Sequence, residues 1–87
     1  MATAVADGSS LTELAVRHRE AAGRHHEAAG RHEEMAAYWA TQGDEALAEL
    51  ERRSAELDRA AAAIENDRAE LHERRASGAG AASRPGA

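Results

Sequence analysis

The sequence predicts an all-α protein, a two-helix antiparallel coiled-coil hairpin, and three observations support this fold class. Residues 17–37 are three consecutive copies of one seven-residue unit, RHREAAG, RHHEAAG and RHEEMAA. Seven residues is the repeat of helices that pack along one seam. Ala, Glu and Arg dominate the composition, and all three favour helices. The single proline stands at position 85, so no proline interrupts the middle of the chain.

The first helix is expected to start at residue 10, because Ser10 and Glu13 have the spacing of a capping box. Residues 1–9 are small and polar and are expected to be disordered. The following residues repeat in alternating steps of three and four, which places them on one helical face. In heptad notation, the a positions are Leu11, His18, His25, His32 and Trp39, and the d positions are Leu14, Ala21, Ala28 and Met35.

A turn is expected near residues 42–44, because Gly43 suits a helix end and Asp44 suits the cap of the next helix. A second heptad follows to residue 76, with a small-residue tail over 77–87 that is expected to be disordered. Its d positions are Leu50, Leu57, Ile64 and Leu71, and its a positions are Leu47, Ser54, Ala61 and Arg68. One continuous helix in a coiled-coil dimer remains the alternative, since a change of heptad register also explains the break.

The hairpin is preferred because its two arms, 11–42 and 44–76, are nearly equal in length. The register that this suggests pairs Trp39 with Leu50, His32 with Leu57, Ala28 with Ala61, His25 with Ile64 and His18 with Leu71. A lone hairpin buries only a narrow stripe, so two hairpins are expected to associate into a four-helix bundle. The predicted interface seam is Leu11, Leu14, Ala21, Ala28, Met35, Trp39, Leu47, Leu50, Leu57, Ile64 and Leu71.

His18, His25 and His32 are the candidates for pH sensing or ligand binding. They recur every seven residues, whereas two metal ligands on one helix need a spacing of three or four. The residues three and four positions from His25 and His32 are Ala or Met, so one helix alone cannot chelate a metal. Three interpretations remain: polar seam residues, a pH-sensitive core, or a histidine-lined bundle that binds metal or haem with ligands from another helix. No cofactor is expected.

The composition argues against several functional classes. The net charge is −5, with 16 acidic and 11 basic residues, which disfavours nucleic acid as the main partner. No apolar run reaches membrane-spanning length, and the N-terminus does not resemble a signal peptide, so a cytoplasmic protein is expected. Neither a nucleophile–base pair nor a phosphate-binding loop is recognisable, so an enzyme is not expected. The predicted function is a coiled-coil interaction or oligomerisation module that binds itself or a helical protein.

A second alternative rests on a resemblance. The chain is shorter than a hundred residues, acidic, Cys-free and Ala-rich, and Trp39 precedes the central turn. In this outline it resembles the small WXG-type helical hairpins exported by type VII secretion, which would imply a secreted protein. The motif of that family would place glycine at position 41, where this chain has Thr41 and delays glycine to Gly43. The C-terminal export signal of the family, which contains a tyrosine, has no counterpart after Tyr38.

Overall fold

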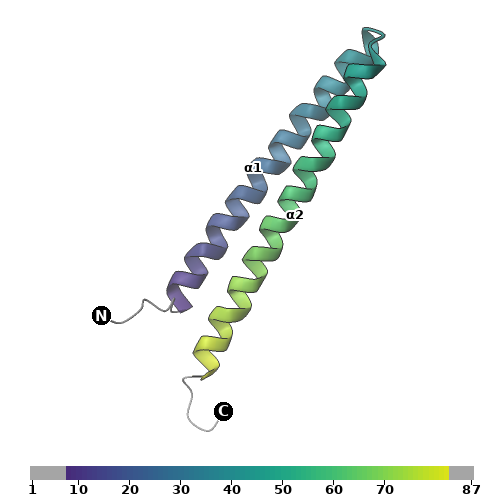
Figure 1. The fold of residues 1–87 in the computed structure, drawn as a ribbon. Coiled ribbons are helices and arrows are strands. Elements are labelled where there is room, and N and C mark those ends of the chain that lie inside the picture. The colour runs from purple at the N-terminus through teal and green to yellow at the C-terminus, as the bar shows by residue number, and fades with distance from the viewer. Residues whose placement is uncertain (1–7, 83–87) are drawn as a thin grey trace, which may run out of the picture.

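The computed structural model describes residues 8–82 as two helices that fold back on each other (Figure 1). Helix α1 spans Gly8–Thr41 and helix α2 spans Glu45–Ala82. The two helices pack side by side, and no strand occurs within these residues. The predicted all-helical hairpin is therefore confirmed, and the alternative of one continuous helix is wrong.

Both helices are longer than the heptad patterns predict. Helix α1 starts at Gly8, so Ser10 lies inside its first turn rather than before it. Helix α2 continues through residues 77–82, where the sequence predicts a disordered tail. Extending an existing helix costs only the propensity of each added residue, and half of residues 77–82 are alanine. The expected disorder of residues 1–7 and 83–87 lies outside the described residues.

The turn follows helix-capping chemistry. The amide of Gly43 donates to the carbonyl of Ala40 at 3.1 Å, and the amide of Asp44 donates to the carbonyl of Trp39 at 2.9 Å. This pair of bonds is a Schellman motif. Gly43 has a φ of 78°, a conformation that favours glycine. The carboxylate of Asp44 then accepts a hydrogen bond from the amide of Leu47 at 3.0 Å, so Gly43 ends α1 and Asp44 caps α2.

Only alanine is buried between the helices, among the residues whose burial the structure describes (9–78). We call these eight residues the alanine seam: Ala15, Ala22, Ala29 and Ala36 of α1, and Ala48, Ala55, Ala62 and Ala69 of α2. Within each helix these alanines recur every seven residues. The two sets are also symmetric about position 42: each α1 alanine lies as many residues before it as one α2 alanine lies after it. The alanines therefore form four levels along the hairpin. Methyl groups allow helices to approach to the short end of the usual range of about 8–10 Å.

The predicted register is wrong for α2. Its d positions, Leu50, Leu57, Ile64 and Leu71, are exposed, and the buried alanine of each heptad lies two residues earlier. The predicted pairs of His18, His25 and His32 with these residues are therefore not formed. Such pairs would have set imidazole nitrogens against aliphatic groups that cannot hydrogen-bond to them. Of the other predicted seam residues, Met35 is exposed, whereas Leu11, Leu14, Ala21, Ala28, Trp39 and Leu47 are half-buried beside the alanine seam.

Two glycines of α1 should weaken the helix without serving the fold. A Cβ added at Gly23 or Gly30 meets nothing within 4 Å. Replacing either with alanine is expected to raise the free energy of unfolding by about 1 kcal/mol, the usual difference between these residues inside a helix. Gly43→Ala is the matched comparison and should lower stability by about 1–2 kcal/mol, because its positive φ disfavours a side chain.

Urea unfolding followed by circular dichroism measures all three variants. Equal midpoints for Gly23→Ala and Gly43→Ala would contradict the assignment of one position to a helix interior and the other to a left-handed turn.

Candidate interaction surface

Four large aliphatic side chains lie exposed along α2. Leu50, Leu57, Ile64 and Leu71 are 55%, 71%, 51% and 36% exposed, and they recur every seven residues. We call them the aliphatic stripe. Each stands two residues after an alanine of the seam, which is about 200° around a helix. The stripe therefore lies on a face of α2 turned away from α1. Large apolar groups exposed in a regular row, rather than singly, are typical of an interaction surface.

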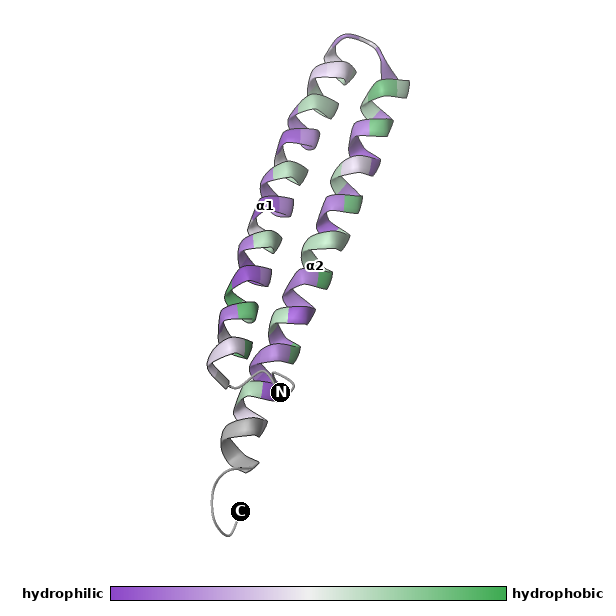
Figure 2. Ribbon diagram, turned by 60° about the vertical axis from the view of Figure 1, so that its left-hand side comes forward, coloured by the Kyte–Doolittle hydropathy of each residue, from purple (hydrophilic) through white to green (hydrophobic). Residues whose placement is uncertain are grey.

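The residues beside the stripe are small at its centre and charged toward its ends. The run Ala60–Ala63 lies between Leu57 and Ile64, and Ala60 and Ala63 are exposed. Arg53 follows Leu50 by three residues, and Asp67 follows Ile64 by three. Figure 2 shows hydrophobic positions recurring along α2 between hydrophilic ones. A partner helix that covered the stripe would therefore meet a narrow apolar row with charged margins.

A row of histidine–carboxylate pairs joins the two helices beside the alanine seam. Nδ1 of His18 lies 2.8 Å from Glu65 Oε2, and Nδ1 of His32 lies 2.6 Å from Glu51 Oε2. Asp58 lies between these pairs: Oδ1 is 3.6 Å from Nδ1 of His25, and Oδ2 is 3.5 Å from Nε2 of His32.

The row continues beyond His18 to His72. The two imidazole rings stack with centroids 5.2 Å apart and planes 14° from parallel, and Nδ1 of His72 is buried without a hydrogen-bond partner.

Sequence reasoning missed the α2 half of this row, namely Glu51, Asp58, Glu65 and His72. A signal for it exists in the sequence. These residues also recur every seven positions, each three residues after a seam alanine of α2. His18, His25 and His32 follow seam alanines of α1 by the same three residues. If the repeated alanines of the two arms are aligned with each other, instead of the large apolar residues, the histidines of the first arm lie opposite the carboxylates of the second.

The interpretation of the histidines as metal ligands gains no support from this geometry. Within the part of the chain that the structure describes, no group of three or more His, Asp or Glu residues is arranged to hold a metal ion. Nδ1 of His18 and Nδ1 of His32 are instead directed at carboxylates. The row therefore serves as a set of polar contacts between helices that fixes which residues of α1 and α2 lie at the same level.

The other side of the hairpin carries exposed ion pairs between the helices. Arg19 donates to Glu73 through Nη2 at 2.6 Å, and Arg59 pairs with Glu33. The hydrogen bond to Glu73 raises the pKa of Arg19 above its ordinary value, which leaves its charge unchanged near neutral pH. Exposed pairs of this kind contribute little stability.

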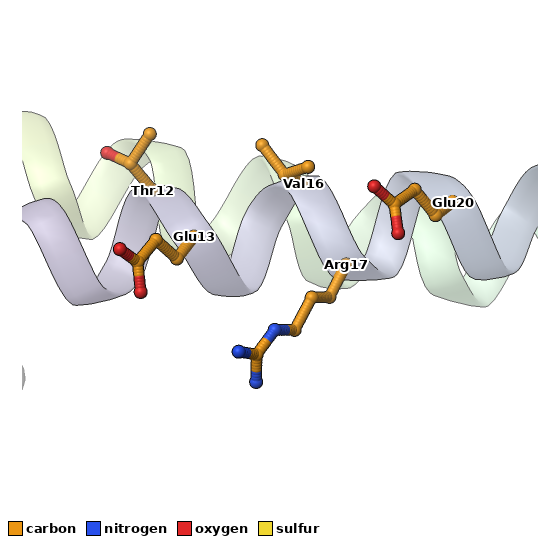
Figure 3. A pocket seen from close by; sticks show the side chains of 5 residues that line it. All are labelled: Thr12, Glu13, Val16, Arg17 and Glu20. Carbon is orange, nitrogen blue, oxygen red and sulfur yellow. The ribbon is translucent and has the colours of Figure 1, made fainter.

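Among the described residues, two shallow surface hollows are each lined by a single helix. One is lined by Thr12, Glu13, Val16, Arg17 and Glu20 of α1 (Figure 3). Another is lined by Glu70, Glu73, Arg74 and Ser77 of α2. Neither has walls from both helices, so neither encloses a small molecule. Over the described residues, neither helix contains an apolar stretch that could cross a membrane.

The pair of His18 and Glu65 makes stability depend on pH. The hydrogen bond with His18 lowers the pKa of Glu65 below its ordinary value of 4.5, and Arg68 acts in the same direction. A carboxylate whose pKa is lowered by folding stabilises the fold above its unfolded value, and this contribution is lost as pH falls through the folded value. At neutral pH, Glu65→Gln should therefore unfold at a lower urea concentration than the unmodified chain. Well below pH 4.5, the variant and the unmodified chain should unfold at the same urea concentration.

Urea titrations at about pH 7, 5 and 3 check this expectation, since they span the range in which carboxylates titrate. Glu56→Gln, an exposed position of the same helix, is the matched control and should match the unmodified chain throughout. A deficit in Glu65→Gln that persists unchanged at pH 3 would show that the carboxylate charge is not its cause.

Comparisons of this chain with known protein families, with curated proteins and with solved structures find no match. The resemblance to WXG-type hairpins thus rests on length, composition and the position of Trp39 before the turn.

Proposed function

We propose that this chain is a non-enzymatic helical module that associates with another helical surface through the aliphatic stripe. One observation carries the proposal: four large aliphatic residues, Leu50, Leu57, Ile64 and Leu71, are exposed at exact heptad spacing along one helix. Heptad spacing keeps side chains in line with a second helix that packs alongside. The stripe therefore suits a coiled-coil contact with a helical partner.

The composition of the hairpin interior supports the same proposal. The interior buries only alanine among residues 9–78, so the four stripe residues of α2 are not used to hold the two helices together. Leucine and isoleucine are among the residue types most often found buried in folded proteins. Covering them by a partner gives these residues the burial that the hairpin itself does not.

The strength expected of such a contact is moderate. Complete burial of one Leu or Ile side chain contributes about 1.5–3 kcal/mol. The stripe residues are 36–71% exposed, so covering all four contributes roughly 3–6 kcal/mol per chain. Association also costs several kcal/mol in lost translational and rotational freedom. The stripe alone therefore suits a reversible contact, in which the partner supplies an apolar stripe of its own.

Photocrosslinking in the native cells tests the proposal. A photoreactive benzophenone amino acid at position 53, beside Leu50 and Leu57, is expected to form adducts on irradiation. The same amino acid at position 23 should form none above background, because Gly23 faces open space on α1. Adding Leu57→Glu and Ile64→Glu should abolish the adducts of position 53 and leave helicity unchanged, since both residues are exposed.

Equal adduct yields at positions 53 and 23 would contradict an association through the stripe. Loss of helicity in the Leu57→Glu/Ile64→Glu variant would show that these residues maintain the hairpin itself, which would also contradict the proposal.

A further inference from the structure

We infer that the partner of the aliphatic stripe is a second copy of this chain, whose α2 lies antiparallel to the first. This inference rests on the proposed function and names its partner. The four stripe residues are symmetric about the point between residues 60 and 61. A twofold axis through that point pairs Leu50 with Leu71 of the second copy and Leu57 with Ile64 of the second copy. All eight residues are then covered, because a twofold interface brings the same patch of both chains together.

The centre of this arrangement suits close helix packing. The run Ala60–Ala63 contains the proposed twofold axis. Ala62 faces α1 as part of the alanine seam, whereas Ala60 and Ala63 are exposed and Ala61 is half-buried. Small side chains at the axis allow two helices to approach closely enough for the flanking Leu and Ile residues to interdigitate. The hairpin already uses alanine in this way between α1 and α2.

The charges beside the stripe favour the antiparallel orientation. Arg53 and Asp67 lie at equivalent helical positions on the margin of the stripe, on opposite sides of the proposed axis. Antiparallel pairing about this axis brings Asp67 of the second copy to within one residue of the level of Arg53, and the symmetry forms this pair twice. Within the described part of a single hairpin, Arg53 lies 3.6 Å from Glu49, and Asp67 has no ion pair.

The parallel orientation lacks this complementarity. It places Arg53 at the level of Arg53 of the second copy, and Asp67 at the level of Asp67. It also gathers the Arg74–Arg75 pairs of both chains at one level, where like charges repel.

The position of α1 is compatible with the pairing. The stripe stands about 200° around α2 from the alanine seam, so α1 lies outside the contact between the two α2 helices. The result is an assembly of four helices in the order α1, α2, α2, α1. This assembly contains four helices, as the sequence predicts for two associated hairpins, and the two α2 helices lie at its centre.

Solution mass and charge reversal test the inference on the full chain. Light scattering should give the 9.2 kDa of one chain at low concentration and twice this mass at high concentration. The Leu57→Glu/Ile64→Glu variant should remain at the mass of one chain, with unchanged circular dichroism. Arg53→Asp should raise the dissociation constant of the dimer about three- to tenfold, as expected for two exposed ion pairs. The double variant Arg53→Asp/Asp67→Arg should restore it, because the pair is re-formed with its charges exchanged.

Spin labels measure the orientation directly, since the chain has no native cysteine. Labels at Arg53→Cys should lie about 22 Å apart along the axis and labels at Arg74→Cys about 40 Å apart, from the rise of 1.5 Å per residue. A parallel dimer would instead give similar short distances at both sites, and that result would overturn the inference.

The two proposals fail in different ways. A chain that stays monomeric up to millimolar concentration, while position 53 still crosslinks to another protein in cells, overturns the second-copy inference and retains the interaction module. A monomeric chain without crosslinks at position 53 contradicts both.

Discussion

The close packing of the two helices, with only methyl groups between them, is the constraint on which the rest of the structure depends. Alanine at every seventh residue of both helices leaves no room for a larger side chain along the line of contact. The positions next to this line then lie close enough for short polar side chains to meet across it. A seam of leucines would hold the two backbones farther apart. It would separate Nδ1 of His18 from Oε2 of Glu65, which are 2.8 Å apart here.

Two consequences follow from this constraint on opposite sides of α2. Beside the seam, the carboxylates of Glu51, Asp58 and Glu65 reach the histidines of α1 and fix the level of one helix against the other. Away from the seam, Leu57 and its three heptad equivalents find no place between the helices and face outward. The polar row therefore does more than join the helices. By setting the rotation of α2 about its axis, it determines which face of α2 stays exposed.

The sequence contains enough information for the fold and for the turn, because these depend on local signals. Gly43 and Asp44 stand together between two heptad patterns, and each has a capping preference that does not depend on tertiary contacts. Large apolar residues alone could not predict which face of α2 packs against α1. Leu50 and its equivalents recur every seven residues, and so do Ala48 and its equivalents, so two heptad patterns compete for the contact. Which of these two heptads of α2 faces α1 depends on α1 itself, because the repeated position of α1 is His and not Leu.

The candidate site was therefore predicted in part. The residues of the aliphatic stripe were identified as an interface, but they were assigned to the interior of the hairpin. His18, His25 and His32 were identified as unusual, but their partners were not, since a carboxylate such as Asp58 on a highly charged helix looks like any solvated side chain. A search for residues three positions after each alanine in both arms would have joined the two sets. That search requires knowing that alanine, the smallest apolar residue, occupies the contact.

In the association that we propose, folding and binding are linked. The stripe exists as one surface only when residues 50–71 are helical, because side chains seven positions apart share no face in an unfolded chain. A partner that covers the stripe therefore binds the folded hairpin and not the unfolded chain, and it raises apparent stability by mass action. The alanine seam itself consists of methyl groups alone, so it buries little apolar area for its length. The hairpin by itself leaves the four residues of the aliphatic stripe outside its interior.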